Sequence, residues 1–178
     1  MYIAGEWVDS ESGERMEATS PATGDSLGSV PAGTREDAQR AIKAANASWR
    51  NWAARSAFER AEAMERVAAV VADRRDDLAR TLTLDQGKPL RAEAYDEVDE
   101  LQQYWLMAAA DARRLEGTMP PSVSAEKRVL VYRVPKGVVG VITPWNWPYT
   151  MPAEVIAPAL AAGNAIVWVP APTTSRAR

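Results

Sequence analysis

Residues 137–170 read GVVGVITPWNWPYTMPAEVIAPALAAGNAIVWVP. Gly137 to Thr143 is a short β-branched apolar run, which is typical of a buried strand, and Ala165 to Val169 is a second such run. Between them, Thr150 to Ala162 has helical spacing, and Gly163 supplies a helix stop. A strand, a helix and a strand in this order predict a βαβ crossover unit.

The helix of this unit is expected to bury one face, made of Met151, Val155, Ala159 and Ala162. In βαβ units, ligands bind at the carboxyl ends of the strands. The loop from Thr143 to Pro148, which follows the first strand, is therefore where chemistry is expected.

The same stretch resembles the NAD(P)-dependent aldehyde dehydrogenases. Their equivalent segment reads close to ITPWNFP, then MPAWKIAPALAAGN, and then a strand that ends in lysine-proline. The resemblance implies an α/β fold, the N-terminal part of an aldehyde dehydrogenase-like fold. In that fold, a β-hairpin and helices precede the first βαβ unit of a Rossmann-like parallel sheet.

Composition describes an ordinary globular chain of 178 residues, with 47% apolar and 25% charged residues and a net charge of −3. No basic run suggests nucleic acid, and no apolar run is long enough to span a membrane. The chain has no cysteine and no histidine, which excludes thiolate or imidazole metal ligands, so no metal site is expected. The N-terminus does not resemble a signal peptide, and a cytoplasmic location is expected.

Strands and turns are expected over residues 1–33, followed by helices. Thr34 can cap a helix that runs to Trp52, and the capping box Ser56 to Glu59 opens a second helix, extended or restarted through Leu82. After the break at Gly87-Lys88-Pro89, a third helix is expected to reach about Leu115, and Gly117 to end it.

Lys127 to Val134 alternates loosely and predicts an exposed strand. In the resembled family, such a strand belongs to an oligomerisation arm. The predicted organisation is therefore residues 1–126 as the N-terminal part of the cofactor-binding domain, 127–136 as the arm strand, and 137–178 as an incomplete first βαβ unit.

Two motifs on the helices favour structural interpretations. The acidic run around Glu97, Asp99 and Glu100 is expected to be a solvated face, because further metal ligands are missing. Gly87-Lys88-Pro89 lacks the glycines of a phosphate-binding loop and is interpreted as a helix connection.

Asn146 is the candidate catalytic residue. Its side-chain amide is a neutral donor that suits a developing oxyanion, although the pattern alone favours an asparagine that caps a turn. The resemblance implies the oxyanion role. By the same comparison, Ile142, Thr143, Pro144, Trp145 and Asn146 are expected to line the path of NAD or NADP.

Two positions depart from the family pattern: Val169 stands where a lysine is usual, and Pro172 where a glutamate, serine or threonine is usual. The preference between NAD and NADP is therefore left open.

The family's cysteine nucleophile and glutamate base are absent from this chain. The function implied is oxidation of a small-molecule aldehyde to a carboxylic acid, with this chain inactive alone. A homo-oligomer or a complementing chain is expected as its partner. The alternative is a non-catalytic binding or assembly module.

Overall fold

Two short antiparallel hairpins open the chain in the computed structural model, which describes residues 1–174. The first pairs β1 (Tyr2–Ile3) with β2 (Glu6–Trp7). The second pairs β3 (Arg15–Thr19) with β4 (Ser26–Pro31). The strands and turns predicted for this region are confirmed.

Three helices follow, and the predicted cap at Thr34 and the predicted capping box at Ser56 are both formed. Helix α1 (Arg35–Ala53) is capped by Thr34, and helix α2 (Ala57–Asp73) is capped by Ser56. Helix α3 (Arg75–Gln86) restarts after a break in helical geometry at Arg74. The extension through Leu82 is therefore a separate helix.

The connection after α3 contains a turn of π-helix. Gly87 ends α3 with a left-handed backbone (φ 81°), and after Pro89 the π-helical turn η1 (Leu90–Ala94) leads into helix α4 (Tyr95–Arg113). Helix α4 ends at Arg113, before the predicted limit at Leu115.

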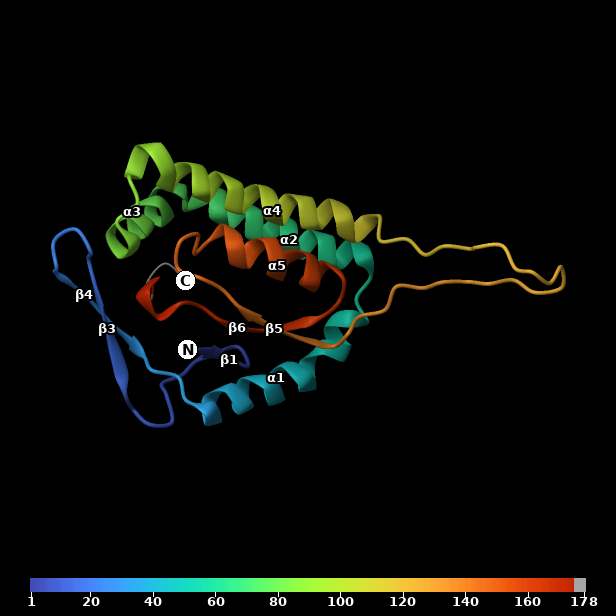
Figure 1. Ribbon diagram of the computed structural model, residues 1–178, viewed down its shortest axis with the longest axis horizontal. Coiled ribbons are helices and arrows are strands. Elements are labelled where there is room, and N and C mark those ends of the chain that lie inside the picture. The colour runs from blue at the N-terminus through green and yellow to red at the C-terminus, as the bar shows by residue number, and fades with distance from the viewer. Residues whose placement is uncertain (175–178) are drawn as a thin grey trace.

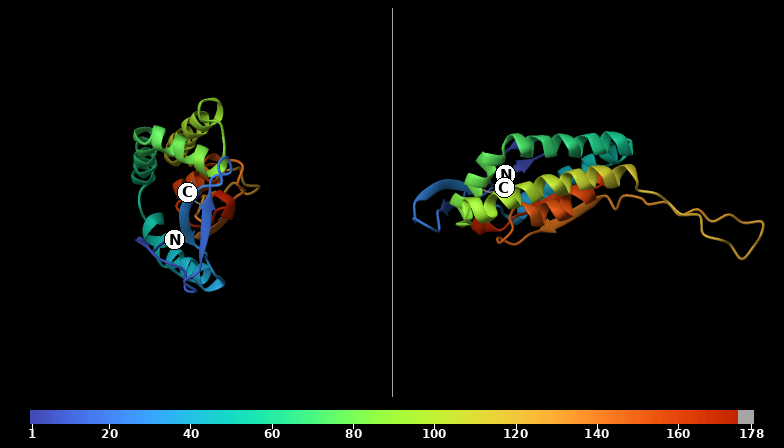
Figure 2. Two further views of the ribbon diagram at one scale, coloured as in Figure 1. Left: turned by 90° about the vertical axis from the view of Figure 1, so that its left-hand side faces the viewer. Right: turned by 90° about the horizontal axis from the view of Figure 1, so that it is seen from above.

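Residues 114–136 project from the body as a long arm of two limbs (Figures 1 and 2). The predicted strand from Lys127 to Val134 is wrong, because the arm contains only one isolated β-bridge, between Thr118 and Val131. Three prolines in the arm, at positions 120, 121 and 135, offer no backbone N–H to a ladder. Among residues 1–174, no further strand lies beside the arm to extend its backbone hydrogen bonding.

The C-terminal part is the predicted βαβ unit. Strand β5 (Val138–Ile142) pairs in parallel with β6 (Ala165–Val169), and helix α5 (Thr150–Ala161) connects them. The short 3-10 helix η2 (Pro172–Thr174) follows. Residues 175–178 of the predicted third segment lie outside the described residues.

The strand pair lies between helices. Helix α5 covers one face, with α2 and α4 stacked beyond it, and α1 covers the other face (Figure 1). The expectation that both strands are buried is nevertheless wrong, because Val141 is the one buried residue in β5 and β6. Their ends are open, with Ile142 85% exposed and Val169 49% exposed. A sheet of two strands leaves both edges without a neighbour.

The buried face of α5 is not the predicted one. Met151 and Val155 are exposed, whereas the residues turned inward include Ala153, Ala157 and Ala161. Ala157 and Ala161 pack against the alanine-rich face of α4, and their small side chains let the helices approach closely. The predicted stripe included Met151 and Val155, whose larger side chains do not fit this close contact.

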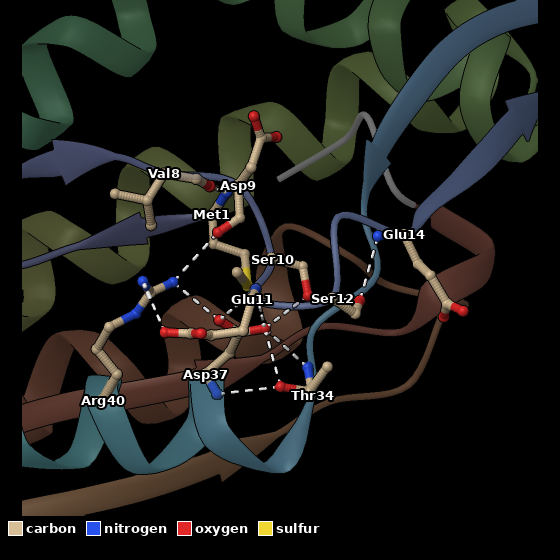
Figure 3. Close-up of polar contacts among 10 residues, drawn as sticks. All are labelled: Met1, Val8, Asp9, Ser10, Glu11, Ser12, Glu14, Thr34, Asp37 and Arg40. Carbon is tan, nitrogen blue, oxygen red and sulfur yellow. Dashed lines mark hydrogen bonds and ion pairs between the residues drawn. The ribbon is translucent and has the colours of Figure 1, made fainter.

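The N-terminal segment is held to α1 through the buried carboxylate of Asp37 (Figure 3). That carboxylate accepts hydrogen bonds from the Thr34 amide at 2.9 Å, the Ser10 hydroxyl at 2.7 Å and the Glu11 amide at 3.2 Å, and it pairs with Arg40 at 2.8 Å. The Thr34 amide, followed by Ser10 and Glu11, lowers the pKa of Asp37 to about 2, against the opposing effect of burial.

None of the described helices is both long enough and apolar enough to cross a lipid bilayer.

Candidate functional site

The loop from Thr143 to Tyr149 joins the carboxyl end of β5 to the first residue of α5. Thr143 is buried, and its hydroxyl accepts a hydrogen bond from the indole nitrogen of Trp168 at 2.9 Å. Pro144, Trp145 and Asn146 are exposed, as is Ile142 before them. The five predicted cofactor residues therefore share one strand end, with Thr143 beneath the surface.

The backbone of Asn146 is held firmly although its side chain is exposed. Its carbonyl oxygen accepts hydrogen bonds from Gln86 Nε2 at 2.9 Å and from Lys88 Nζ at 3.1 Å. Gln86 also donates to the carbonyl of Trp145 at 3.1 Å. The end of α3 thus fixes two successive peptide groups, from which the Asn146 amide projects.

Glu97 caps the start of α5 from a different helix. The α5 sequence offers no side-chain cap of its own. One carboxylate oxygen of Glu97 instead accepts hydrogen bonds from the Tyr149 amide at 2.9 Å and the Thr150 amide at 3.4 Å. A negative group at this position satisfies unpaired N–H groups and complements the positive end of the helix.

Lys88 neutralises that carboxylate. Its Nζ lies 2.6 Å from the other oxygen of Glu97 and 3.7 Å from the centre of the Trp147 ring. The side chain of Lys88 is 5% exposed and that of Glu97 is 0% exposed. Lys88 therefore contacts the loop in two ways, through a peptide carbonyl and through an aromatic face.

The solvated face predicted for the acidic run is wrong at Glu97. The sequence did contain a signal that Glu97 is buried. Glu97 lies three residues after Ala94 and four residues before Leu101. That spacing places it on the apolar face. A charge on such a face requires a buried partner, and Lys88 is that partner. Gly87-Lys88-Pro89 does connect helices as predicted, but its lysine also belongs to the site.

Tyr149 closes the inner side of the loop. Its ring packs into the cluster formed by Val71, Leu82 and Val98, and its hydroxyl donates to the carbonyl of Leu78 at 3.2 Å. Burial, together with the nearby Glu97 carboxylate, raises the pKa of Tyr149. Tyr149 is therefore a neutral anchor for the loop.

An open hollow of about 230 Å³ lies beside Asn146, and its lining includes Gln86, Lys88, Trp145 and Trp147. A larger hollow of about 460 Å³ lies at the base of the arm, away from the predicted site residues. Within residues 1–174, no group of three or more acidic, histidine or cysteine side chains is arranged to hold a metal ion.

The chemistry that this arrangement supports follows from the exposed Asn146 amide. It is a neutral donor on an exposed residue whose carbonyl is held by Gln86 and Lys88, in the loop between β5 and the N-terminus of α5. A donor fixed in advance stabilises developing negative charge without rearranging.

Comparison with known proteins places the chain in a family. The model of the aldehyde dehydrogenase family matches residues 7–177. The chain therefore belongs to the aldehyde dehydrogenase family.

Individual relatives agree. A 3-sulfolactaldehyde dehydrogenase of Pseudomonas putida is 43% identical over 97% of this chain and 35% of the relative. A succinate-semialdehyde dehydrogenase [NADP(+)] of Escherichia coli is 42% identical over 97% of this chain and 36% of the relative. A crystal structure of a betaine aldehyde dehydrogenase variant from Staphylococcus aureus, in complex with NAD+, superposes with a TM-score of 0.95 at 34% identity. It covers 99% of this chain and 36% of the solved one.

The chain thus spans about a third of the length of the relatives that it matches. The predicted family and the predicted fold, the N-terminal part of an aldehyde dehydrogenase-like fold, are confirmed.

Proposed function

We propose that this chain is the N-terminal part of an enzyme that oxidises an aldehyde to a carboxylic acid with NAD or NADP. The observation that carries the proposal is the position of Asn146. Its exposed amide lies where β5 ends and α5 begins, on a peptide held by Gln86 and Lys88. Membership of the aldehyde dehydrogenase family supports the reaction class.

In this proposal, Asn146 stabilises the oxyanion. A thiolate adds to the aldehyde carbon, the C=O π bond breaks, and its electrons move to oxygen. The Asn146 amide then donates a hydrogen bond to that oxygen and offsets its charge. The chain has no cysteine, so residues outside this sequence must supply the thiolate.

The strand ends are suited to one end of a dinucleotide. Ile142 offers an exposed apolar surface, and the loop through Thr143, Pro144, Trp145 and Asn146 offers peptide groups beside it. NAD or NADP, when bound, supplies the hydride acceptor. The neighbouring strand end, at Val169, carries neither a charge nor a hydrogen-bonding side chain, so it does not select between the two cofactors.

The arm and the sheet edges suggest the partners. The side chains of Leu130, Tyr132 and Val134 are 56%, 73% and 74% exposed. An apolar surface of this kind favours contact with another polypeptide. We assign the arm over 127–136 to assembly, with a second copy or a complementing chain as partner and the cytoplasm as the expected location. The division of the chain into residues 1–126, 127–136 and 137–178 is also part of this proposal.

A hybrid enzyme tests the proposed function. Residues 1–174 replace the matching segment of the E. coli succinate-semialdehyde dehydrogenase, and formation of reduced cofactor is followed with a panel of aldehydes. The hybrid is expected to turn over, whereas the chain by itself is not. Asn146→Ala in the hybrid should lower kcat by about 100-fold to 1,000-fold and change KM less, since the bond strengthens as charge develops.

Asn46→Ala is the matched control, because it removes an exposed asparagine amide from α1, away from the loop. It should leave kcat unchanged. If the hybrid is active and Asn146→Ala leaves its kcat unchanged, Asn146 forms a turn and does not stabilise the oxyanion. A folded and assembled hybrid without turnover would favour the alternative, a binding or assembly module.

A further inference from the structure

The Lys88–Glu97 ion pair is almost completely buried. Its side chains are 5% and 0% exposed, whereas those of Arg75 on α3 and Asp99 on α4 are 41% and 49% exposed. Desolvation of two charges offsets much of their attraction, and a buried pair is weak grounds for stability. The surface pair already joins α3 to α4, so the presence of a second, buried pair in the connection between them requires another explanation.

That explanation lies in the contacts of the pair with the loop. Lys88 donates to the carbonyl of Asn146 at 3.1 Å. Glu97 accepts from the amide of Tyr149 at 2.9 Å. The pair therefore holds the loop on both sides of Trp147, whose ring Lys88 also contacts.

Gln86 completes this arrangement, with its bonds to the carbonyls of Trp145 and Asn146. Except for the contact with the Trp147 ring, every bond from Gln86, Lys88 and Glu97 to the loop ends on a backbone group. The side chain of Asn146 is left exposed. Backbone restraints of this kind orient a side chain without occupying its donor.

We propose that Lys88 and Glu97 are positioning residues that hold the Asn146 amide in the orientation required for catalysis. The inference rests on the proposed oxyanion role of Asn146. A donor contributes most when it is fixed before charge develops, because no reorganisation is then needed during the reaction. Each charge keeps the other paired, and together they join the α3–α4 connection to the loop.

The test removes both charges at once. Lys88→Met with Glu97→Leu replaces the pair by apolar side chains of similar size, a change that often leaves folding intact, whereas a single substitution would strand one buried charge. Asp99→Asn is the matched control, since Asp99 also lies on α4 and also pairs with a residue of α3.

The first readout is hydrogen exchange of the hybrid enzyme, followed by mass spectrometry. The loop peptide covering 145–150 should exchange about 10-fold faster or more in the double variant, because bonds to charged groups are lost. The α4 peptide covering 101–112 should be unchanged, and Asp99→Asn should alter neither the loop nor this peptide. Unchanged exchange in the loop would overturn the inference.

The second readout is a double-mutant cycle in the hybrid enzyme. The double variant should lower kcat per folded active site by about 10-fold or more with KM little changed. In the Asn146→Ala background, the same change should lower kcat by less than about 2-fold, because residues that act through one another are not additive. Equal losses in both backgrounds would indicate a general structural role and overturn the inference.

The two proposals fail in different ways. If Asn146→Ala alone leaves kcat unchanged, the oxyanion role fails, and with it the catalytic purpose of the pair. If Asn146→Ala lowers kcat but the double variant leaves loop exchange and kcat unchanged, only the positioning role fails.

Discussion

The indole nitrogen of Trp168 donates a hydrogen bond to the hydroxyl of Thr143 at 2.9 Å, and this bond ties the end of β6 to the end of β5. The backbone ladder between the strands continues to the same point, where the Thr143 amide contacts the Val169 carbonyl at 3.4 Å. The bond therefore fixes the place where the loop leaves the sheet.

Removing this side-chain bond should destabilise the chain modestly. Trp168→Phe and Thr143→Val each delete one partner, and each should lower the free energy of unfolding by about 1 to 2 kcal/mol. Urea denaturation followed by circular dichroism, at one protein concentration for all variants, measures the loss. The two losses should not add in the double variant, because they remove one bond. Full additivity would show that the two side chains contribute independently.

Acid should weaken the attachment of the N-terminal segment. The pKa of Asp37 is about 2 in the folded chain, against an ordinary value of 3.8. The unfolded chain therefore takes up the proton first as the pH falls, so the stabilisation is complete above pH 3.8 and is lost towards pH 2. Asp37→Asn should lower the denaturation midpoint at neutral pH, and its difference from the parent should shrink through this window.

Ser10→Ala provides a graded comparison, since it removes one donor to the carboxylate and keeps the charge. The pH range over which the Asp37 carboxylate loses its stabilising effect should be narrower in Ser10→Ala than in the parent, because the pKa of Asp37 moves back towards its ordinary value. A difference between parent and Asp37→Asn that stays constant from pH 6 to pH 2 would contradict this account.

Gly117 allows the two limbs of the arm to approach. A Cβ atom at this position would lie 2.2 Å from the carbonyl oxygen of Val131, which is impossible without a backbone shift. Gly117→Ala should break the bridge between Thr118 and Val131 and speed amide exchange at both residues. Global stability should change by less than about 0.5 kcal/mol, because the arm is exposed.

Gly140→Ala is the matched control, since a Cβ added there meets nothing within 4 Å. It should leave exchange in the arm unchanged. Retention of the Thr118–Val131 bridge in Gly117→Ala would mean that the limbs can separate locally without losing their hydrogen bonds.

The chain alone should self-associate. Strands β5 and β6 have no further neighbours among residues 1–174, and the arm exposes apolar side chains. Unpaired edges and exposed apolar surface recruit other chains. Sedimentation velocity over a range of concentrations should show oligomers or aggregates. A single 19.4 kDa species at every concentration would refute the prediction.

The sequence by itself determined the order of the elements. Local signals act between residues that are close along the chain. These were sufficient for the helix caps at Thr34 and Ser56, the stop at Gly163 and the β-branched strands around residues 138–142 and 165–169. The long resemblance over residues 137–170 was sufficient to predict both the family and the fold class.

Only the tertiary structure decided which faces are buried and what holds the loop. The inner face of α5 depends on how closely α4 approaches, and the strand predicted from Lys127 to Val134 required a neighbour that the described residues do not provide. Glu97 lies beside charged residues in the sequence, yet its partners are Lys88 and the amides of Tyr149 and Thr150. A buried charge is stable only where such partners converge in space, and residue order alone does not specify that convergence.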